Sequence, residues 1–183
     1  MTIHHPYRPE QTLRPFAAGD LEALHDLGSR PEVTRYLYWG PRSRAESEAA
    51  LEAKLQRTRL VDTGDAINLA VIERANGAFV ADGLLILTSD EHRGGEVGYI
   101  VHPEATGRGI ATETARIMLS LGFEGAGLHR IIGRLDRRNA ASARVLERLG
   151  MRREAHFVRN EMVDGEWTDE VVYAMLEEEW TSP

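Results

Sequence analysis

Residues 101–119 read VHPEATGRGIATETARIML, and this stretch decides how the chain folds. Two glycines, Gly107 and Gly109, flank Arg108 directly before a segment whose apolar residues follow helical spacing. A helix that begins near Ile110 leaves its first N–H groups unpaired, and glycines allow the backbone to come close to a ligand. The stretch therefore predicts a helix whose N-terminus can hold an anion. A tight helix entrance that binds nothing is the alternative interpretation.

The residues before this stretch predict an antiparallel front half. Asn76-Gly77 is a strong β-hairpin signal between two segments with strand character. Ser43 and Glu46 form an S-x-x-E capping box, which predicts a helix reaching about Arg59. Short helices are also expected after Gly19-Asp20 and within 31–41. Strands are expected at 12–16, 65–75, 78–90 and 96–101.

The residues after it predict two strand–helix units and a closing pair of strands. Residues at i, i+3, i+4 and i+7 from Ser142 to Leu149 share one helical face, and this helix is expected to stop at Gly150. Strands are expected at 129–135, 151–158 and 167–176, the last two around the turn VDGE. The chain is thus predicted to form a single α/β domain over 12–178, with 1–11 as a flexible N-terminal segment.

Composition and charge exclude several classes of function. The chain has 183 residues, a net charge of −7 and no cysteine, which excludes disulfides, thiolate metal sites and cysteine nucleophiles. An acidic chain is unsuited to broad nucleic-acid binding, and its longest apolar runs are too short to cross a membrane. The first residues lack the pattern of a secretion signal, so a cytoplasmic location is expected. The histidines show no metal-ligand spacing, and His4-His5 is expected in a flexible terminus.

Two familiar phosphate-binding loops do not match the glycine stretch. A Walker loop requires Gly-Lys-Ser/Thr, and GRGIAT contains no lysine. A dinucleotide-binding fingerprint needs glycine at its sixth position, where this chain has Thr112. It also needs glycines directly after a strand, whereas HPEAT follows Val101 here. Both are excluded by residue identity.

Together with its neighbours, however, the stretch resembles the GNAT superfamily of acetyl-CoA-dependent N-acetyltransferases, and most closely the RimJ/RimL-type branch. The family loop Q/R-x-x-G-x-G/A corresponds to TGRGIA at 106–111, where Thr106 departs from Gln or Arg. A second motif, N-x-x-S-x-x-x-L-x-x-x-G, is present within NAASARVLERLGM at 139–151. EVGYIVHPE precedes both, and LRPF and EVTRYLYWG near the start also look like the RimJ/RimL type.

The resemblance implies a central, mixed, mostly antiparallel twisted sheet with splayed strands and flanking helices. It places the pantetheine arm of acetyl-CoA between the strands at 96–101 and 129–135, paired with backbone groups of one of them. Backbone amides around the glycine loop would surround the diphosphate. It implies no metal, and members of the family are often homodimers. Cofactor binding is expected at Ile100, Val101, Gly107, Arg108, Gly109, Ile110, Ala111, Thr112, Asn139 and Ser142.

Glu96 is the candidate general base, acting through water on the acceptor amine. An alkylammonium with a pKa near ~10.4 must lose a proton before it can attack a thioester. By alternation Glu96 shares a face with Gly98 and Ile100. An ordinary polar residue at the start of a strand is the alternative interpretation. The thioester carbonyl is expected to be polarised by a backbone N–H near Ile100 or Val101.

Ser142 is the second candidate catalytic residue. Many GNAT enzymes protonate the leaving thiolate with a tyrosine at the position where this chain has Leu146. The resemblance therefore assigns Ser142 as the acid or as a hydrogen-bond donor to the thiol. A first-turn serine that bonds the backbone is the alternative. Asn139 is expected to cap the helix and to contact the pantetheine or thioester.

The predicted function is acetyl transfer from acetyl-CoA to a primary amine by direct attack in a ternary complex. The acceptor is a protein N-terminus or a small amine. Tyr36, Tyr38 and Trp39 form a candidate acceptor wall, although core packing with one exposed ring is the favoured interpretation. A non-catalytic acyl-CoA sensor of the same fold is the alternative function, and an interaction module without a CoA site is a weaker one.

Overall fold

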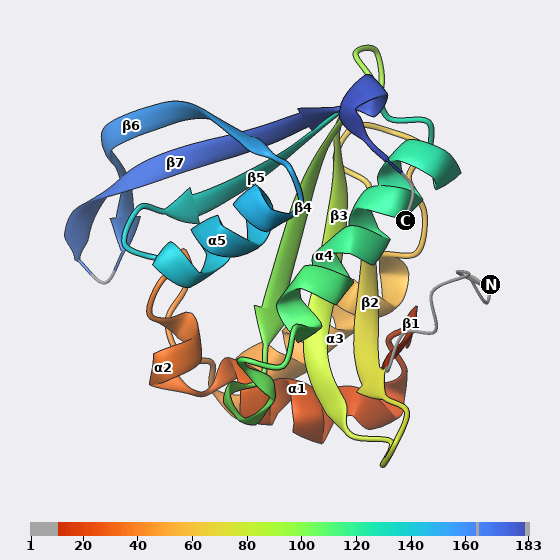
Figure 1. Cartoon of the computed structure of the whole chain (residues 1–183). Helices are drawn as coiled ribbons and strands as arrows, with labels where there is room; N and C mark the ends of the chain where they lie inside the picture. The colour runs from red at the N-terminus through yellow and green to blue at the C-terminus, as the bar shows by residue number, and fades with distance from the viewer. Residues whose placement is uncertain (1–10, 164, 182–183) are drawn as a thin grey trace.

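The computed structural model describes residues 11–163 and 165–181, and within them seven strands form one sheet in the order β1-β2-β3-β4-β5-β7-β6. The strands are β1 (Gln11–Pro15), β2 (Ala66–Glu73), β3 (Phe79–Ser89), β4 (Gly94–Val101), β5 (Arg130–Asp136), β6 (Arg152–Val163) and β7 (Glu166–Leu176). The helices are α1 (Leu21–Gly28), α2 (Pro31–Thr34), α3 (Arg44–Gln56), α4 (Ile110–Ser120) and α5 (Ala140–Arg148). Helices α4 and α5 cover one face of the sheet, and α1 and α3 lie on the other (Figure 1).

The sheet opens between β4 and β5. Among the described strands only these two pair in parallel, and only over Gly94–Glu96 with Arg130–Ile132. Beyond Glu96 the two strands diverge, because β5 continues its pairing with β7 on its other side (Figure 1). The resulting gap, which we call the wedge, opens toward the carboxyl ends of both strands. The loop into α4 and the start of α5 follow those two strand ends.

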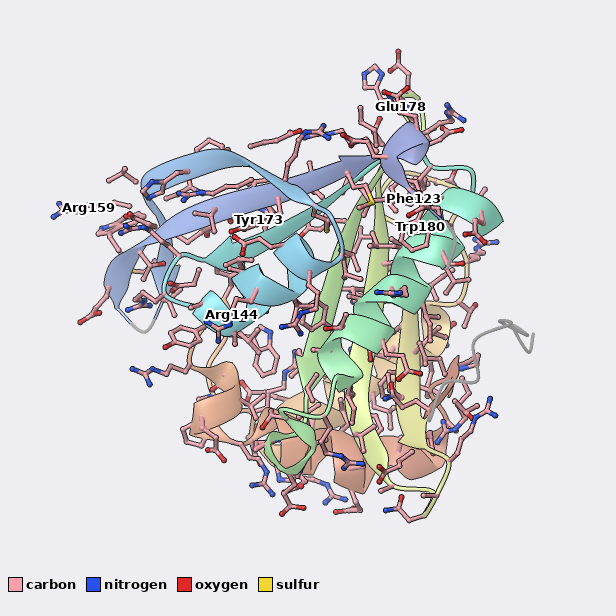
Figure 2. The ribbon with its side chains drawn as sticks, in the orientation of Figure 1. Phe123, Arg144, Arg159, Tyr173, Glu178 and Trp180 are labelled. Carbon is pink, nitrogen blue, oxygen red and sulfur yellow. The ribbon has the colours of Figure 1, made fainter. Side chains whose placement is uncertain are left out.

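The main core lies between the sheet and α4. Leu85, Met118, Leu119 and Ile131 are fully buried there. Fully burying such side chains stabilises the fold by about 1.5–3 kcal/mol each. A turn of π-helix at Leu121–Gly125 extends α4, and Phe123 in it stacks on Trp180 with ring centroids 5.8 Å apart (Figure 2). The C-terminal end of the described chain is thereby attached to the core.

The expected elements are confirmed in type and order, with corrections at their ends. Ser43 caps α3 as predicted, but the helix ends at Gln56 and not near Arg59. Strand β6 runs to Val163, beyond the expected 158, and the π-helical turn was not predicted. Gln11, expected in a flexible segment, is buried at the start of β1. Residues 1–10, including His4-His5, and residue 164 of the VDGE turn lie outside the described residues.

Candidate active site

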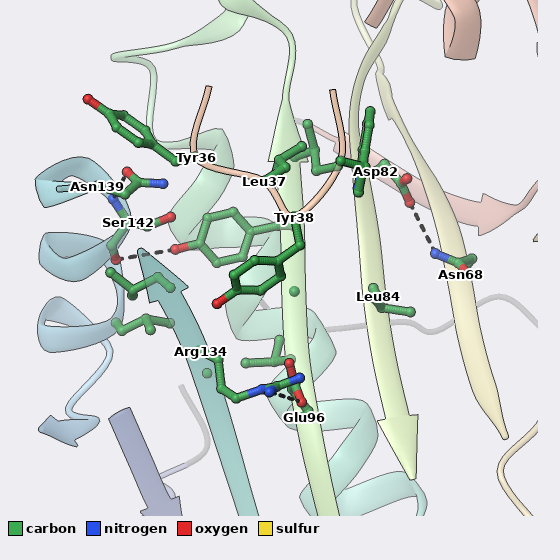
Figure 3. Close-up of a pocket in the computed structure, with 18 of the residues that line it drawn as sticks. Tyr36, Leu37, Tyr38, Asn68, Asp82, Leu84, Glu96, Arg134, Asn139 and Ser142 are labelled. Carbon is green, nitrogen blue, oxygen red and sulfur yellow. Dashed lines mark hydrogen bonds and ion pairs between the residues drawn. The ribbon is translucent and has the colours of Figure 1, made fainter. Parts of the chain in front are cut away.

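A pocket of about 300 Å³ lies at the wedge (Figure 3). Alternation along β4 directs Glu96, Gly98 and Ile100 to the α3 face of the sheet and Val97 and Tyr99 to the α4 face. All five residues line the pocket. The pocket is therefore accessible to groups from both faces, and it passes through the sheet where β4 and β5 separate.

Glu96, the candidate general base, lines this pocket, where it is ion-paired. Its Oε2 is 3.1 Å from Nε of Arg134 on β5. Arg134 also lies 3.7 Å from the buried carboxylate of Glu170 on β7, which accepts a 2.7 Å hydrogen bond from the Tyr38 hydroxyl. Burial and that carboxylate together raise the pKa of Tyr38. The network holds Glu96 in one orientation and ties the loop before α3 to the sheet.

The start of α5 contributes Asn139 and Ser142 to the pocket (Figure 3). Oδ1 of Asn139 accepts a 3.1 Å hydrogen bond from the backbone N–H of Ser142, so the predicted N-cap is present. In the described part of the chain the Ser142 hydroxyl makes no hydrogen bond to the backbone. It is therefore not a first-turn serine bonded to the backbone, and it lies beside the Tyr99 hydroxyl in the pocket.

One hydrophobic side chain, Leu146, and one aromatic side chain, Tyr99, complete this side of the pocket. Leu146 is 2% exposed and packs on Gly133, where an added Cβ would lie 2.8 Å from the leucine Cδ1. The Tyr99 hydroxyl donates to the backbone carbonyl of Ser142 over 3.3 Å and so spans from β4 to α5. Burial raises the pKa of Tyr99 to about 12, which keeps the phenol protonated. Tyr99 was not predicted, because its role depends on the Ser142 carbonyl, which lies far away in the sequence.

The glycine loop has the backbone geometry of an anion site. Gly107 and Gly109 adopt left-handed conformations, with φ of +77° and +81°. Gly109 is the N-cap of α4 and offers no side-chain hydrogen bond, which leaves the first N–H groups of the helix open. Arg108, expected beside the diphosphate, is ion-paired with Glu73 of β2. The backbone therefore provides the available donors, while the arginine is held to the side.

The aromatic loop forms one wall of the pocket. It is lined by three aromatic residues, Tyr36, Tyr38 and Trp39. Of these rings only that of Tyr38 is exposed, at 43%. The guanidinium of Arg42 stacks on Trp39, 3.7 Å from the ring centroid. All three side chains therefore border the pocket, and one ring is exposed.

A buried polar cluster, absent from the sequence predictions, lies at the α3 end of the pocket. Lys54 of α3 and Asp82 of β3 form an ion pair of 2.6 Å, with both side chains almost fully buried. Asn68 of β2 donates to Asp82 over 3.3 Å, whereas its Oδ1 has no protein partner among the described residues (Figure 3). Polar residues in the middle of apolar strands were the signal that could have revealed this cluster.

The described residues contain no group of three or more His, Asp or Glu side chains placed to hold a metal ion. Over the same residues, no helix combines the length and apolar character needed to span a bilayer. Beside its apolar and aromatic residues, the pocket presents hydroxyl, amide, carboxylate, guanidinium and ammonium groups.

Comparisons with known proteins agree with this geometry. The acetyltransferase (GNAT) domain family model matches residues 11–152. The uncharacterized N-acetyltransferase YnaD of Bacillus subtilis is 31% identical over 92% of this chain and 94% of its own. The spermidine N(1)-acetyltransferase of Escherichia coli K12 is 22% identical over 92% of this chain and 87% of its own.

Solved structures show the same fold. The GNAT-family acetyltransferase from Bacillus anthracis superposes with a TM-score of 0.86 at 30% identity, covering 98% of this chain and all of that one. Spermidine N-acetyltransferase from Vibrio cholerae, in complex with CoA and spermine, superposes with a TM-score of 0.81 at 23% identity, covering 93% and 97%. The chain therefore belongs to the GNAT family and is an N-acetyltransferase.

Proposed function

We propose that the enzyme transfers an acetyl group from acetyl-CoA to a small primary amine by direct attack within a ternary complex. The observation that carries this proposal is the pocket that passes through the sheet at the wedge. A thioester entering from the α4 and α5 side can meet an amine that enters from the α3 side. Because both molecules have their own access, no covalent acetyl-enzyme is required.

Two backbone features fit acetyl-CoA. From Val97 to Val101 the edge of β4 that faces β5 has no partner among the described strands. The backbone groups of Val101 point into this gap and can pair with pantetheine amides, whereas the register with β3 pairs Ile100 with Asp82, which corrects the expectation for Ile100. The open N–H groups at the start of α4, from Ile110 to Thr112, suit a diphosphate. Bulky residues at the two glycines would obstruct the same approach.

The pocket residues account for both proton transfers in the reaction. The ammonium loses its proton through water to Glu96, and the amine nitrogen then attacks the thioester carbon. A backbone N–H near Ile100 or Val101 stabilises the oxyanion. As the C–N bond forms and the C–S bond breaks, the second nitrogen proton reaches the leaving sulfur through the Ser142 hydroxyl, which gives its own proton to the sulfur and takes the nitrogen proton in its place. Asn139 fixes the first turn of α5, which carries that hydroxyl.

The size of the pocket supports a small acceptor. A volume of about 300 Å³ is at the lower end of the usual range for ligand pockets. A protein N-terminus is the acceptor that the RimJ/RimL-type resemblance implies, and it is our second candidate. The resemblance also implies a homodimer, which analytical ultracentrifugation would test.

Two observations favour the alternative function of an acyl-CoA sensor. Glu96 is ion-paired with Arg134, and Leu146 occupies the position of the family tyrosine. Release of CoA can be followed with a thiol reagent, since the chain has no cysteine to contribute background. CoA release that depends on an added amine or peptide N-terminus supports the enzyme. CoA binding in a calorimeter without release would identify a sensor, and absent binding would refute both.

A further inference from the structure

The charge of the pocket is opposite to that of the chain. Four cationic side chains and two carboxylates line it, a formal charge of +2 in a chain of −7. The cations are Arg42, Lys54, Arg57 and Arg134, and the carboxylates are Asp82 and Glu96. A cationic pocket in an acidic protein attracts anions from solution.

Two guanidinium groups in the pocket have no ion-pair partner among the described residues. Lys54 is neutralised by Asp82 at 2.6 Å, and Arg134 is paired with Glu96 at 3.1 Å and with Glu170 at 3.7 Å. In residues 11–163 and 165–181 neither Arg42 nor Arg57 has a carboxylate within 4 Å. Neither charge is therefore neutralised by an ion pair, and the carboxylates of Asp82 and Glu46 act on Arg42 from a longer distance.

Arg42 is held in place for such a role. Its guanidinium stacks on Trp39 at 3.7 Å from the ring centroid, and its backbone N–H donates to the carbonyl of Gly28 over 2.9 Å. Burial lowers the pKa of Arg42, since the charged form is partly desolvated. A guanidinium fixed in this way presents a planar set of donors that matches a carboxylate.

These two arginines lie on the opposite side of the sheet from the expected diphosphate site. Arg42 follows the aromatic loop, and Arg57 ends α3, where its carbonyl accepts a 2.9 Å hydrogen bond from the N–H of Asn68. The glycine loop leads into α4 on the other face (Figure 1). The two guanidinium groups are therefore available to the acceptor and not to the phosphates of CoA.

We propose that the acceptor is a small primary amine that also carries a carboxylate, which binds Arg42 and Arg57 while the amine lies beside Glu96. This inference rests on the proposed function. A polyamine would bring a second ammonium toward two unneutralised guanidinium groups. The pocket thus selects a substrate class different from the one named for the spermidine acetyltransferases.

Matched acceptors test the proposal directly. Each ω-amino acid from glycine to 6-aminohexanoate is compared with the alkylamine and the diamine of equal chain length, and L-α-amino acids are compared with their carboxamides. We expect the best carboxylate acceptor to exceed its neutral counterpart at least tenfold in kcat/KM, with diamines lowest. Equal or higher values for neutral amines or diamines would overturn the inference and leave the proposed function intact.

Variants identify the residues responsible. Arg42→Met keeps an unbranched apolar stem, and we expect it to raise KM for the carboxylate acceptor at least tenfold. KM for acetyl-CoA should stay unchanged, and the preference for the carboxylate acceptor over its neutral counterpart should be lost. Arg57→Met is a second variant, and because Arg57 is exposed we expect this substitution to leave the stability of the fold unchanged. Arg59→Met, outside the pocket, is the charge-matched control. Unchanged KM in both pocket variants would refute the assignment. CoA binding without release by any amine would refute the proposed function together with this inference.

Discussion

At the scale of single residues, the ion pair of Glu96 with Arg134 decides how the carboxylate can act. The 3.1 Å contact fixes the carboxylate and lowers its freedom to approach the acceptor directly. We expect Glu96→Gln to reduce kcat about 100-fold, the lower end of the usual contribution of a general base. The low-pH limb of the rate profile should disappear as well, because the amide cannot take up the proton. A pH–rate profile that keeps its shape in this variant would remove Glu96 from the mechanism. Arg134→Met is the companion variant, in which the base is present but not oriented.

Two hydroxyl groups at the wedge can be separated by substitution. Ser142→Ala removes the proposed proton donor, so we expect at least a tenfold loss in kcat with a small change in KM for acetyl-CoA. Tyr99→Phe removes a single 3.3 Å hydrogen bond to the Ser142 carbonyl. Its cost is expected to be about 0.5–1 kcal/mol in the free energy of unfolding. Single-turnover kinetics and urea unfolding measure the two effects. If Tyr99→Phe reduces kcat and Ser142→Ala does not, the roles are reversed.

The residues that sequence analysis identified are those with local signals. Asn139 and Ser142 belong to a motif, and Glu96 starts a recognisable strand; all three line the pocket. Arg134 and Asp82 were missed, because their importance depends on partners far away in the chain. The local signal at Asp82, a carboxylate inside an apolar strand, does not identify Lys54 as its partner.

At the scale of elements, the glycine entrance to α4 makes a prediction with a built-in control. Gly109 and Gly127 both have positive φ, and an added Cβ would meet nothing within 4 Å at either. Alanine at either position is expected to lower the free energy of unfolding by about 1 kcal/mol, because an L-residue is strained in the left-handed conformation. Only Gly109→Ala places a methyl group where the diphosphate is proposed to lie, so we expect CoA affinity to fall at least tenfold in that variant alone. Calorimetry measures the affinity, and equal affinity in the two variants would contradict the proposed site.

The ends of helices and strands were predicted less well than their types. The reason is that the end of a strand depends on how far it pairs with its neighbour in the sheet. Capping at Ser43 is local, and it correctly located the start of α3. The end of β6 depends on β7, which extends the ladder to Val163 through two irregularities in register. The wedge has no sequence signal of its own either, since it arises where β5 remains paired with β7 but is no longer paired with β4. Its position came from the family resemblance.

At the scale of the whole molecule, the Lys54–Asp82 pair joins α3 to the sheet behind the pocket. Lys54→Met would leave a buried carboxylate without its partner, which costs about 3–5 kcal/mol. For a chain of this size about 2–4 °C of melting temperature is lost per kcal/mol. The double variant Lys54→Met/Asp82→Leu leaves no unpaired charge and should recover most of the loss. Calorimetric melting of the parent protein, Lys54→Met, Asp82→Leu and the double variant tests this, and additive losses would show that the pair is not coupled.

Acid stability provides the last prediction for the whole molecule. Asp20, which hydrogen-bonds to Arg14, and Asp26, which hydrogen-bonds to His102 and Arg30, both have lowered pKa values. Hydrogen bonds to backbone N–H groups lower the pKa of Asp65 as well. In each case the folded state binds protons less readily than the unfolded chain, so the stabilisation is complete above the ordinary carboxyl pKa of about 4 and is lost as the pH falls further. The melting temperature should therefore be nearly constant from pH 7 to 5 and fall steeply below 4. Asp20→Asn, which cannot titrate, should melt lower at pH 7 yet lose less on acidification, and a loss equal to that of the parent protein would show that Asp20 does not contribute.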